Sequence, residues 1–382
     1  MRTQAIDRQL ERLKGRPGSR YLLPTPALLL ELDALERNIR VMTERARSAG
    51  LRLRPHAKSH KSAHIAKLQI DAGAVGVCCA KLGEAEALME AGVRGVLVTS
   101  PIVGGDCAER AVQLAHTDTT FQIVVDHPAQ VDVLSACAER HRGKLRVLID
   151  IDVGLARTGA NSVAAALEIA GRVRSSPALL LCGVQGYGGH WQHLPGLGTR
   201  RAAVATGMQR LRAVVDALKA QGAAPEIVTG GGTGTFAADA DLRVLNEVQP
   251  GSYLFMDVQY RDALGADADG AFQQSLFVQS RVVSVNAETH VTVDAGLKAF
   301  ATDGPTPRAV GAGFVDCKYH YFGDEHGRLT RPVTVPSIDL DQRIEFVPPH
   351  CDPTVDRYDR YFLVRQDVFV GTTPIEAARR AQ

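Results

Sequence analysis

Apolar and polar positions alternate along most of this chain in a pattern that predicts strand–helix units. From residue 26 onward, short apolar runs are followed by longer stretches in which apolar residues recur at helical spacing. Strands are predicted at 27–32, 51–54, 74–78, 96–99, 121–125, 145–151, 180–185, 226–229 and 247–249. Helices are predicted most clearly at 34–49, 81–91, 163–173 and 202–221. Repeated strand–helix units of this kind form parallel sheets.

The number and spacing of these strands favour a closed barrel. About eight strands over roughly 230 residues fit a (β/α)8 barrel, and an open doubly wound sheet is the alternative. The pattern changes after about residue 262, where strands without intervening long helices are predicted at 278–286, 290–294, 343–347 and 360–370. We therefore predict an α/β fold with a (β/α)8 barrel at 26–262. A second, mainly β domain would comprise 1–25 plus 263–382.

Composition and charge limit which classes of partner and which cellular compartment we expect. The 382 residues are 45% hydrophobic and 23% charged, and 44 basic residues face 42 acidic ones. This balance predicts no nucleic acid and no membrane as partner. The charged N-terminal segment lacks the apolar core of a signal peptide, and no apolar run reaches the length of a membrane span. Seven cysteines, an odd number, predict reduced thiols and a cytoplasmic protein.

A basic cluster follows the predicted strand at 51–54. Residues 54–61 read RPHAKSHK, so Lys58 lies at the C-terminal end of a strand, where barrel enzymes assemble their active sites. The neighbouring His56, His60 and Lys61 crowd positive charge around Lys58. Crowded cations lower a lysine's pKa and free the amine as a nucleophile. A solvated basic loop is the alternative interpretation.

Glycine-rich segments follow two later strands. Residues 229–235 read TGGGTGT, and consecutive glycines let backbone N–H groups approach an anion such as a phosphate. The spacing is neither a P-loop nor GxGxxG, and a tight turn without a ligand is the alternative. Residues 249–253 read QPGSY and would supply a further phosphate contact.

Two further segments carry side chains suited to catalysis. Residues 348–354 read PPHCDPT, and in an extended segment His350 and Asp352 would point the same way. Imidazole with carboxylate suits a divalent ion such as Mn²⁺, Mg²⁺ or Zn²⁺. Tyr187, His190 and His193 lie in a glycine-rich loop after the predicted strand at 180–185, where a tyrosine stacks on a ring and a histidine acts as base.

In combination these motifs resemble the D-threonine aldolase family, within the fold-type III pyridoxal-phosphate enzymes that include alanine racemase. The resemblance covers nearly the whole chain. Its motifs are TPALLLELD at 25–33, RPHAKSHK at 54–61, DIDVGLARTG at 150–159, GGGTGT at 230–235, QPGSYLFMD at 249–257, VDAGLK at 293–298, DEHG at 324–327 and PHCDPT at 349–354. Two places depart from the family's usual sequence, Thr158 and the loop 188–191, which bears on the substrate.

The resemblance implies a role for each matching residue. Lys58 matches the Schiff-base lysine, Arg157 the arginine at the cofactor's phenolic oxygen, and Tyr187 the residue that contacts its ring. His193 matches a histidine near the substrate hydroxyl. The phosphate-loop positions are Gly232, Thr233, Gly251 and Ser252. Gln249 falls where alanine racemase has an arginine against the pyridine nitrogen. His350 and Asp352 match the metal pair, and His-x-Asp favours aldolases over the His-x-Cys dehydratases.

The family pattern therefore implies a lyase that uses pyridoxal 5'-phosphate and a divalent metal such as Mn²⁺ or Mg²⁺. The expected reaction is retro-aldol cleavage of a D-3-hydroxy amino acid, such as D-threonine, to glycine and an aldehyde. The alternatives are a D-3-hydroxyaspartate aldolase, a hydroxyaspartate or D-serine dehydratase, an amino-acid racemase and a non-enzymatic cofactor-binding protein. The family also implies a homodimer.

Overall fold

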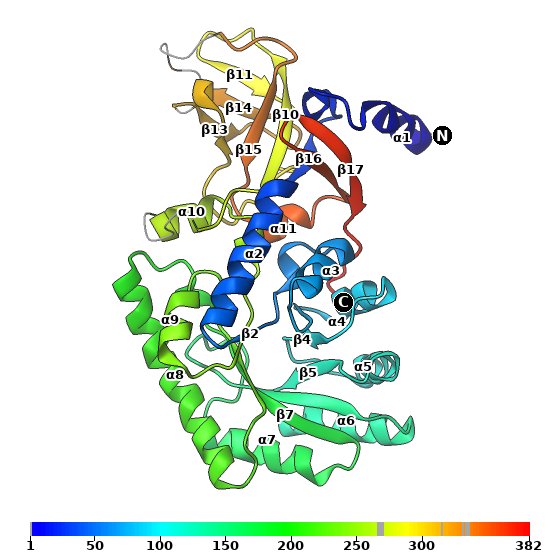
Figure 1. The fold of residues 1–382 in the computed structure, drawn as a ribbon, viewed down its shortest axis with the longest axis vertical. Helices are drawn as coiled ribbons and strands as arrows, with labels where there is room; N and C mark the ends of the chain where they lie inside the picture. The colour runs from blue at the N-terminus through cyan, green and yellow to red at the C-terminus, as the bar shows by residue number, and fades with distance from the viewer. Residues whose placement is uncertain (1, 266–270, 315, 331, 333–336) are drawn as a thin grey trace. The chain divides into compact units, whose positions relative to one another are not determined.

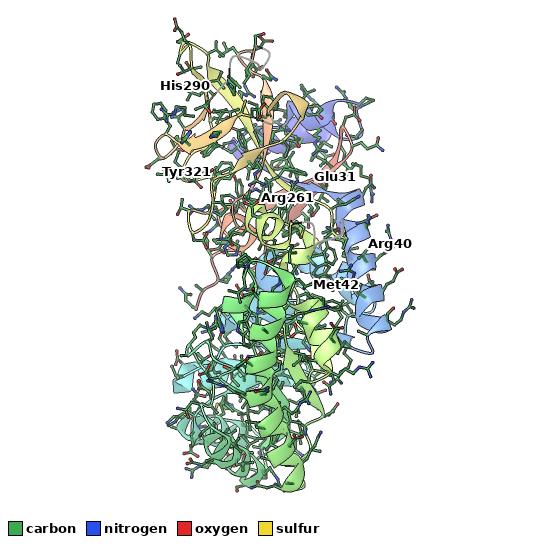
Figure 2. All side chains as sticks on the ribbon, turned by 90° about the vertical axis from the view of Figure 1, so that its left-hand side faces the viewer. Glu31, Arg40, Met42, Arg261, His290 and Tyr321 are labelled. Carbon is green, nitrogen blue, oxygen red and sulfur yellow. The ribbon has the colours of Figure 1, made fainter. Side chains whose placement is uncertain are left out.

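The computed structural model describes residues 2–265, 271–314, 316–330, 332 and 337–382 (Figure 1). The chain divides into two compact units, one formed by Met1–Val41 with Ser252–Arg379 and the other by Met42–Gly251 with Arg380–Gln382. Strand β1 (Ala27–Glu31) passes directly into helix α2 (Leu32–Ser48), and the first boundary lies within that helix (Figure 2, where Glu31, Arg40 and Met42 are labelled). The sequence pattern instead places the domain boundaries after residues 25 and 262.

The larger unit is built on eight parallel strands. They are β2 (Arg52–Leu53), β3 (Val77–Cys79), β4 (Val96–Val98), β5 (Gln122–Val125), β6 (Leu145–Asp150), β7 (Leu179–Gly186), β8 (Ile227–Gly230) and β9 (Glu247–Val248). Their order is β2-β9-β8-β7-β6-β5-β4-β3. A parallel bridge between His56 and Cys78 joins the two end strands, so the sheet curls round to meet itself. The predicted barrel is confirmed over the open sheet.

Helices alternate with these strands, as the apolar spacing predicts. They are α3 (Ala63–Asp71), α4 (Leu82–Glu90), α5 (Gly105–Thr117), α6 (Pro128–Arg140), α7 (Val163–Ser175), α8 (Leu197–Ala220) and α9 (Phe236–Leu242) (Figure 1). Side chains from six neighbouring strands form a fully apolar layer, namely Cys78, Leu97, Val124, Leu148, Cys182 and Ile227. Because strands in a parallel barrel are buried on both faces, their sequences are continuous apolar runs.

The second unit is mainly β. Besides β1 it contains the strands β10 (Leu276–Ser284), β11 (His290–Val293), β12 (Arg308–Ala309), β13 (Lys318–Tyr321), β14 (Gly327–Thr330), β15 (Arg343–Val347), β16 (Arg360–Arg365) and β17 (Val368–Pro374). Its helices are α1 (Arg2–Leu13), α10 (Val258–Leu264) and α11 (Cys351–Val355). The strand order is β13-β14-β11-β10-β1-β16-β17, with β15 paired to β10 and β12. A mainly β second domain is confirmed.

One strand is not where the sequence pattern placed it. The run at 27–32 was expected to open the barrel, but β1 pairs antiparallel with β10 and parallel with β16. All four residues from Ala27 to Leu30 are fully buried. A run buried on both faces looks the same in either sheet, so the assignment to the barrel was wrong while the strand itself was right.

Two global features bear on the predicted compartment. Among the described residues, no helix combines the length and the apolar character needed to cross a membrane. All seven cysteines are free thiols, and burial raises the pKa of Cys78, Cys79 and Cys351 far above its ordinary value. These thiols are therefore protonated and unreactive at neutral pH.

Candidate active site

One hollow at the C-terminal rim of the barrel collects polar side chains from five strand ends, those of β2, β4, β6, β7 and β9. Its lining consists of His56, Lys58, Ala80, Thr99, Ser100, Arg157, Gln185, Tyr187 and Gln249. Because parallel strands end at the same rim, segments up to about 190 residues apart meet there. Four of the predicted site residues, Lys58, Arg157, Tyr187 and Gln249, are thus brought together.

Two cations lie near the ring of Tyr187. Lys58 lies in the 3-10 turn η2 (Ala57–Ser59), and its Nζ is 6.0 Å from the centre of the Tyr187 ring. The Arg157 guanidinium carbon is 5.7 Å from the same centre. An aromatic face flanked by cations suits a planar, negatively charged ligand. The hollow therefore presents an amine, a guanidinium and a ring to a single small molecule.

A buried ion pair anchors the segment that carries Lys58. Arg54 donates from Nε and Nη2 to the two carboxylate oxygens of Glu247, at 2.9 and 3.2 Å, and also bonds the Gly95 carbonyl oxygen. Arg54 is 5% exposed and Glu247 is fully buried. Since Glu247 lies on β9 and Arg54 directly follows β2, the pair joins two neighbouring strands just before the lysine turn.

Glu247→Gln is expected to lower the free energy of unfolding by about 3 kcal/mol, because it leaves the Arg54 guanidinium buried without a counter-charge. Urea unfolding followed by circular dichroism measures the change. Glu226→Gln is the matched control, since that side chain is 68% exposed and its nitrogen–oxygen distance to Arg146 is 3.8 Å. An equal loss in both variants would contradict the anchoring role.

The floor of the hollow is a chain of side-chain amides. Gln249 donates from Nε2 to Gln185 Oε1 and to Thr229 Oγ1, each at 3.1 Å. Gln185 donates from its own Nε2 to the Thr99 carbonyl oxygen and to Asp150 Oδ1, each at 2.9 Å. Each side-chain amide thus donates both of its N–H groups to these partners. Gln249 consequently offers an acceptor oxygen, rather than a donor, to a ligand.

Asp150 ends this chain as a buried carboxyl group. Burial raises its pKa to about 6, although bonds from Gln185 and from Thr158 Oγ1, the latter at 2.8 Å, oppose the shift. Above that pH the carboxylate only accepts hydrogen bonds. It therefore fixes the direction of the Gln185 amide and, through it, that of Gln249.

The predicted phosphate loop follows β8 and has room for backbone only. Gly231 has a φ of +68°, and a Cβ there would lie 2.3 Å from Asp239 Oδ2. A Cβ on Gly232 or Gly234 would lie 2.5 or 2.1 Å from Gln192 atoms. Only glycine fits these three positions. The Gly232 and Gly234 N–H groups bond Thr235 Oγ1 and Gln192 Oε1, so the other backbone N–H groups of the loop and the buried Thr233 are left to meet an anion. This loop chemistry fits a phosphate group.

Three other predicted residues lie outside the lining of the hollow. Gly251 packs beside the Lys58 turn, where a Cβ would meet the His56 carbonyl oxygen at 3.0 Å. Ser252 is buried, begins the turn η4 (Ser252–Leu254) and belongs to the mainly β unit. His193 is exposed in the turn after η3 (Gly189–Trp191). Its role as a base stays a prediction.

The predicted metal pair is not on an extended segment. His350 is the N-cap of α11, and Asp352 lies in the first turn of that helix. Asp257 Oδ2 accepts the Cys351 backbone N–H at 2.8 Å and so holds the start of the helix. Cys351 is fully buried, and its Sγ donates to Asp352 Oδ1 at 3.2 Å. The extended-strand argument for the pair was therefore wrong, because the chain turns helical at Cys351.

A carboxylate missed by sequence reasoning orients His350. Asp303 Oδ2 lies 2.8 Å from His350 Nδ1, which directs Nε2 away from Asp303 as the lone-pair nitrogen. Within the described parts of the chain, no three His, Cys, Asp or Glu side chains are placed to share one ion. The donor set of one imidazole nitrogen and one carboxylate still fits a divalent ion that takes its other ligands from water or substrate.

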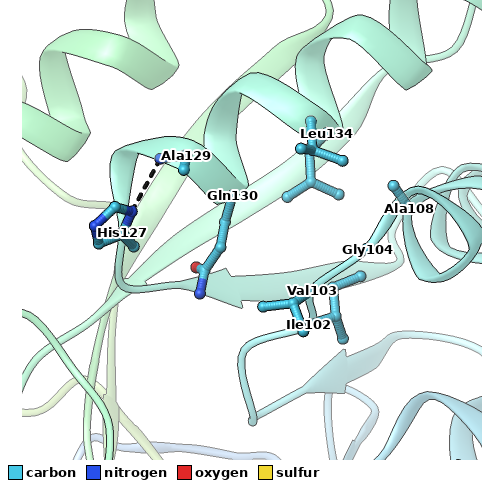
Figure 3. A pocket seen from close by; sticks show the side chains of 9 residues that line it. Ile102, Val103, Gly104, Ala108, His127, Ala129, Gln130 and Leu134 are labelled. Carbon is cyan, nitrogen blue, oxygen red and sulfur yellow. Dashed lines mark hydrogen bonds between the residues drawn. The ribbon is translucent and has the colours of Figure 1, made fainter.

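A second hollow lies between the segments that begin α5 and α6 and has a different character (Figure 3). Its lining is mostly aliphatic and includes Ile102, Val103, Ala108, Val133 and Leu134. His127 Nδ1 accepts the Ala129 N–H at 3.1 Å and caps α6. This lining contains no lysine, arginine or carboxylate, and its one titratable side chain, His127, uses Nδ1 for the helix cap.

Sequence reasoning also missed the supporting residues of the first hollow, Gln185, Asp150, Thr99 and Thr229. Each is a polar residue at the C-terminal end of an otherwise apolar strand. That position is the available signal, because a buried polar group there must be bonded and faces the rim of the barrel.

Comparison with known proteins places both parts of the chain in described families. Residues 30–259 match the family described as alanine racemase, N-terminal domain. Residues 275–364 match a serine dehydratase domain family.

Similar proteins match over almost the entire chain. A 3-hydroxy-D-aspartate aldolase from Paracoccus denitrificans (strain Pd 1222) is 39% identical over 93% of this chain and 92% of its own. A D-threonine aldolase from an Arthrobacter species is 35% identical over 92% of each chain. The crystal structure of D-threonine aldolase from Filomicrobium marinum superposes with a TM-score of 0.89 at 36% identity, over 93% of this chain and 96% of that chain.

Proposed function

We propose that this chain, which belongs to the pyridoxal-phosphate family of D-threonine and 3-hydroxy-D-aspartate aldolases, cleaves a D-3-hydroxy amino acid to glycine and an aldehyde. The membership makes it a carbon–carbon lyase on an alanine-racemase-like barrel. The observation that carries the proposal is the hollow in which the Lys58 amine and the Arg157 guanidinium lie near the Tyr187 ring.

Each lining group has a proposed part in holding pyridoxal phosphate. Lys58 supplies the amine that attaches it, Arg157 faces its phenolic oxygen, and Tyr187 contacts its ring. The acceptor oxygen of Gln249 suits a protonated ring nitrogen. The phosphate would be bound by Gly232, Thr233, Gly251 and Ser252. When bound, the cofactor supplies an electron sink for the pair released by Cα–Cβ cleavage.

The protein's remaining tasks are to polarise the substrate hydroxyl and to remove its proton. We assign the first to a divalent ion such as Mn²⁺ or Mg²⁺, held by His350 Nε2 and an Asp352 oxygen. We assign the second to His193, acting directly or through a water. His193 is exposed, and histidine is the side chain most often used as a base near neutral pH.

Asp303→Asn is expected to weaken Mn²⁺ binding by about 10- to 100-fold, because the carboxylate that fixes the His350 tautomer is lost while both ligands remain. Titration of Mn²⁺ followed by electron paramagnetic resonance measures the dissociation constant. Asp262→Asn is the control, since this carboxylate is 52% exposed and pairs with Arg308. Unchanged Mn²⁺ affinity in Asp303→Asn would remove Asp303 from the site.

The identity of the substrate's side chain is tested by comparing the products formed from three substrates. Purified protein with pyridoxal phosphate and Mn²⁺ is given D-threonine, D-3-hydroxyaspartate or D-serine, and the products are quantified. Glycine with acetaldehyde supports a D-threonine aldolase, and glycine with glyoxylate supports a D-3-hydroxyaspartate aldolase. Ammonia with a keto acid and no glycine would replace the proposal by a dehydratase, which the match of residues 275–364 makes the second candidate.

Assembly is a separate proposal. The family resemblance implies a homodimer, and light scattering of the purified holoenzyme measures its mass. A monomer would contradict this part alone, without affecting the reaction.

A further inference from the structure

A buried carboxyl group lies against the predicted phosphate loop. Asp239, in α9, is 1% exposed, and a Cβ built on Gly231 would lie 2.3 Å from its Oδ2. The loop backbone at Gly231 is therefore in direct contact with Asp239. Burial of a carboxyl group this close to an expected anion site needs a physical reason.

Asp239 ends a hydrogen-bond chain that holds the loop. Thr235 Oγ1 donates to Asp239 Oδ2 at 2.7 Å and accepts from the Gly232 N–H at 3.0 Å. Gln192 donates from Nε2 to the same hydroxyl at 3.2 Å, and its Oε1 accepts the Gly234 N–H at 3.0 Å. The carboxyl group thus fixes the Thr235 hydroxyl, which in turn fixes two loop amides. The loop keeps its shape through this chain.

The surroundings of Asp239 favour its neutral form. Burial raises the pKa of this carboxyl group to about 7, against the opposing bonds from Thr235 and from the Gly232 backbone. Its Oδ1 is buried and has no hydrogen-bond partner among the described residues. The neighbours that the described structure places against it are Thr235, the loop backbone and, through Thr235, Gln192, none of which carries a charge. No cation therefore offsets a negative charge there.

We propose that Asp239 is a positioning residue of the cofactor's phosphate site, which holds Thr235 and the loop and takes up one proton from solvent when the phosphate group binds. The inference rests on the proposed function, because it takes the loop to bind the phosphate of pyridoxal phosphate. An anion bound by the loop that Asp239 contacts disfavours a second negative charge on its carboxylate, and protonation of a carboxylate oxygen removes the repulsion. Phosphate binding and protonation of Asp239 therefore favour each other.

The consequence is a cofactor affinity that falls with rising pH. Below about pH 7 the carboxyl group already holds its proton, so binding needs none. Above it, each binding event takes up a proton, and complete coupling lowers the affinity about tenfold per pH unit. Pyridoxal lacks the phosphate group, so its binding is not coupled to protonation of Asp239. Its affinity is therefore the reference for that of pyridoxal phosphate.

The test compares dissociation constants of pyridoxal phosphate and pyridoxal between pH 6.5 and 9, for protein freed of cofactor. Quenching of the single tryptophan, Trp191, reports binding. We expect the affinity ratio of the two ligands to fall as pH rises in the unmodified protein and to stay constant in Asp239→Asn. Asp241→Asn is the control, because it lies on the same helix, is 63% exposed and pairs with Arg201.

The outcomes separate this inference from the function it rests on. A ratio independent of pH in the unmodified protein overturns the role of Asp239 even if both ligands bind. Retention of the pH dependence by Asp239→Asn overturns it as well. If Asp239→Asn does not fold, the ratio in the unmodified protein decides alone. Failure of the unmodified protein to bind pyridoxal phosphate at any pH would contradict the proposed function itself.

Discussion

Lys58→Ala is expected to lower glycine release by at least about a thousandfold and to abolish the visible absorption of lysine-bound pyridoxal phosphate. The amine of Lys58 faces the hollow shared with Arg157 and Tyr187. The proposed function assigns it the covalent attachment of the cofactor, and loss of that attachment alone is worth orders of magnitude. Initial rates of glycine formation and an absorbance scan measure the two effects.

Lys58→Ala should lower activity without lowering the stability of the protein. The turn that carries Lys58 is anchored by Arg54 and Glu247, so the alanine variant should keep the midpoint of thermal unfolding of the cofactor-free protein. Lys67→Ala is the matched control, since Lys67 is exposed on α3 and donates to the Ala91 carbonyl oxygen at 2.8 Å. Normal activity and an unchanged spectrum in Lys58→Ala would overturn the assignment of the attachment site.

Most of the barrel could be predicted from the sequence because its strands are buried on both faces. The run at 145–151, for example, differs from β6 by one residue, and the run at 180–185 lies inside β7. The same property misled the reading of β1, whose apolar run contains no information about which strands it pairs with. Pairing partners such as β10 lie about 250 residues away and are decided by tertiary packing.

The N-terminal helix was not predicted from the sequence at all. The segment from Arg2 to Leu13 is strongly charged; it was predicted to lack a signal peptide and to join the mainly β domain, with no helix assigned to it. Its Leu10 and Leu13 pack in one cluster with Phe369 of β17. The apolar residues at 6, 10 and 13 do have helical spacing, a signal that was not used, and two of them dock the helix on an existing sheet.

The residues of the candidate site likewise fall into those that the sequence could indicate and those that it could not. Motif resemblance selected Lys58, Arg157 and Tyr187, which the structure brings into one hollow, because the chemistry of their side chains is visible in the sequence. Asp150 and Asp239 went unassigned, because their importance lies in burial and in hydrogen bonds to partners that only folding defines. The backbone conformation of a short motif is also not predictable from its side-chain chemistry unless a residue such as proline indicates it.

The metal motif contained such a signal. Pro353 follows Asp352 directly, and proline is well tolerated in the first turn of a helix, where its missing N–H is not needed. The motif therefore indicates a helix start at Cys351 rather than an extended segment. This geometry makes His350 a capping residue and leaves its ring to the Asp303 contact.

Asp352→Ala is expected to lower glycine release by about a thousandfold, because polarisation of the substrate hydroxyl by a divalent ion is worth several kcal/mol. One imidazole alone does not retain Mn²⁺ or Mg²⁺, which prefer oxygen ligands. Treating the unmodified protein with a chelator should therefore give a similar loss. Adding Mn²⁺ back should restore the unmodified protein and not the variant, while both keep the visible absorption of bound pyridoxal phosphate.

This retained absorption distinguishes loss of the metal from loss of the cofactor, which Lys58→Ala causes. Asp341→Ala is the control for removal of a carboxylate from the mainly β unit, since Asp341 is 70% exposed and pairs with Arg343. Full glycine release by Asp352→Ala or by the chelated protein would mean that the hydroxyl proton leaves without a Lewis acid. The base, proposed to be His193, would then bear the whole task, and His193→Ala would become the decisive variant.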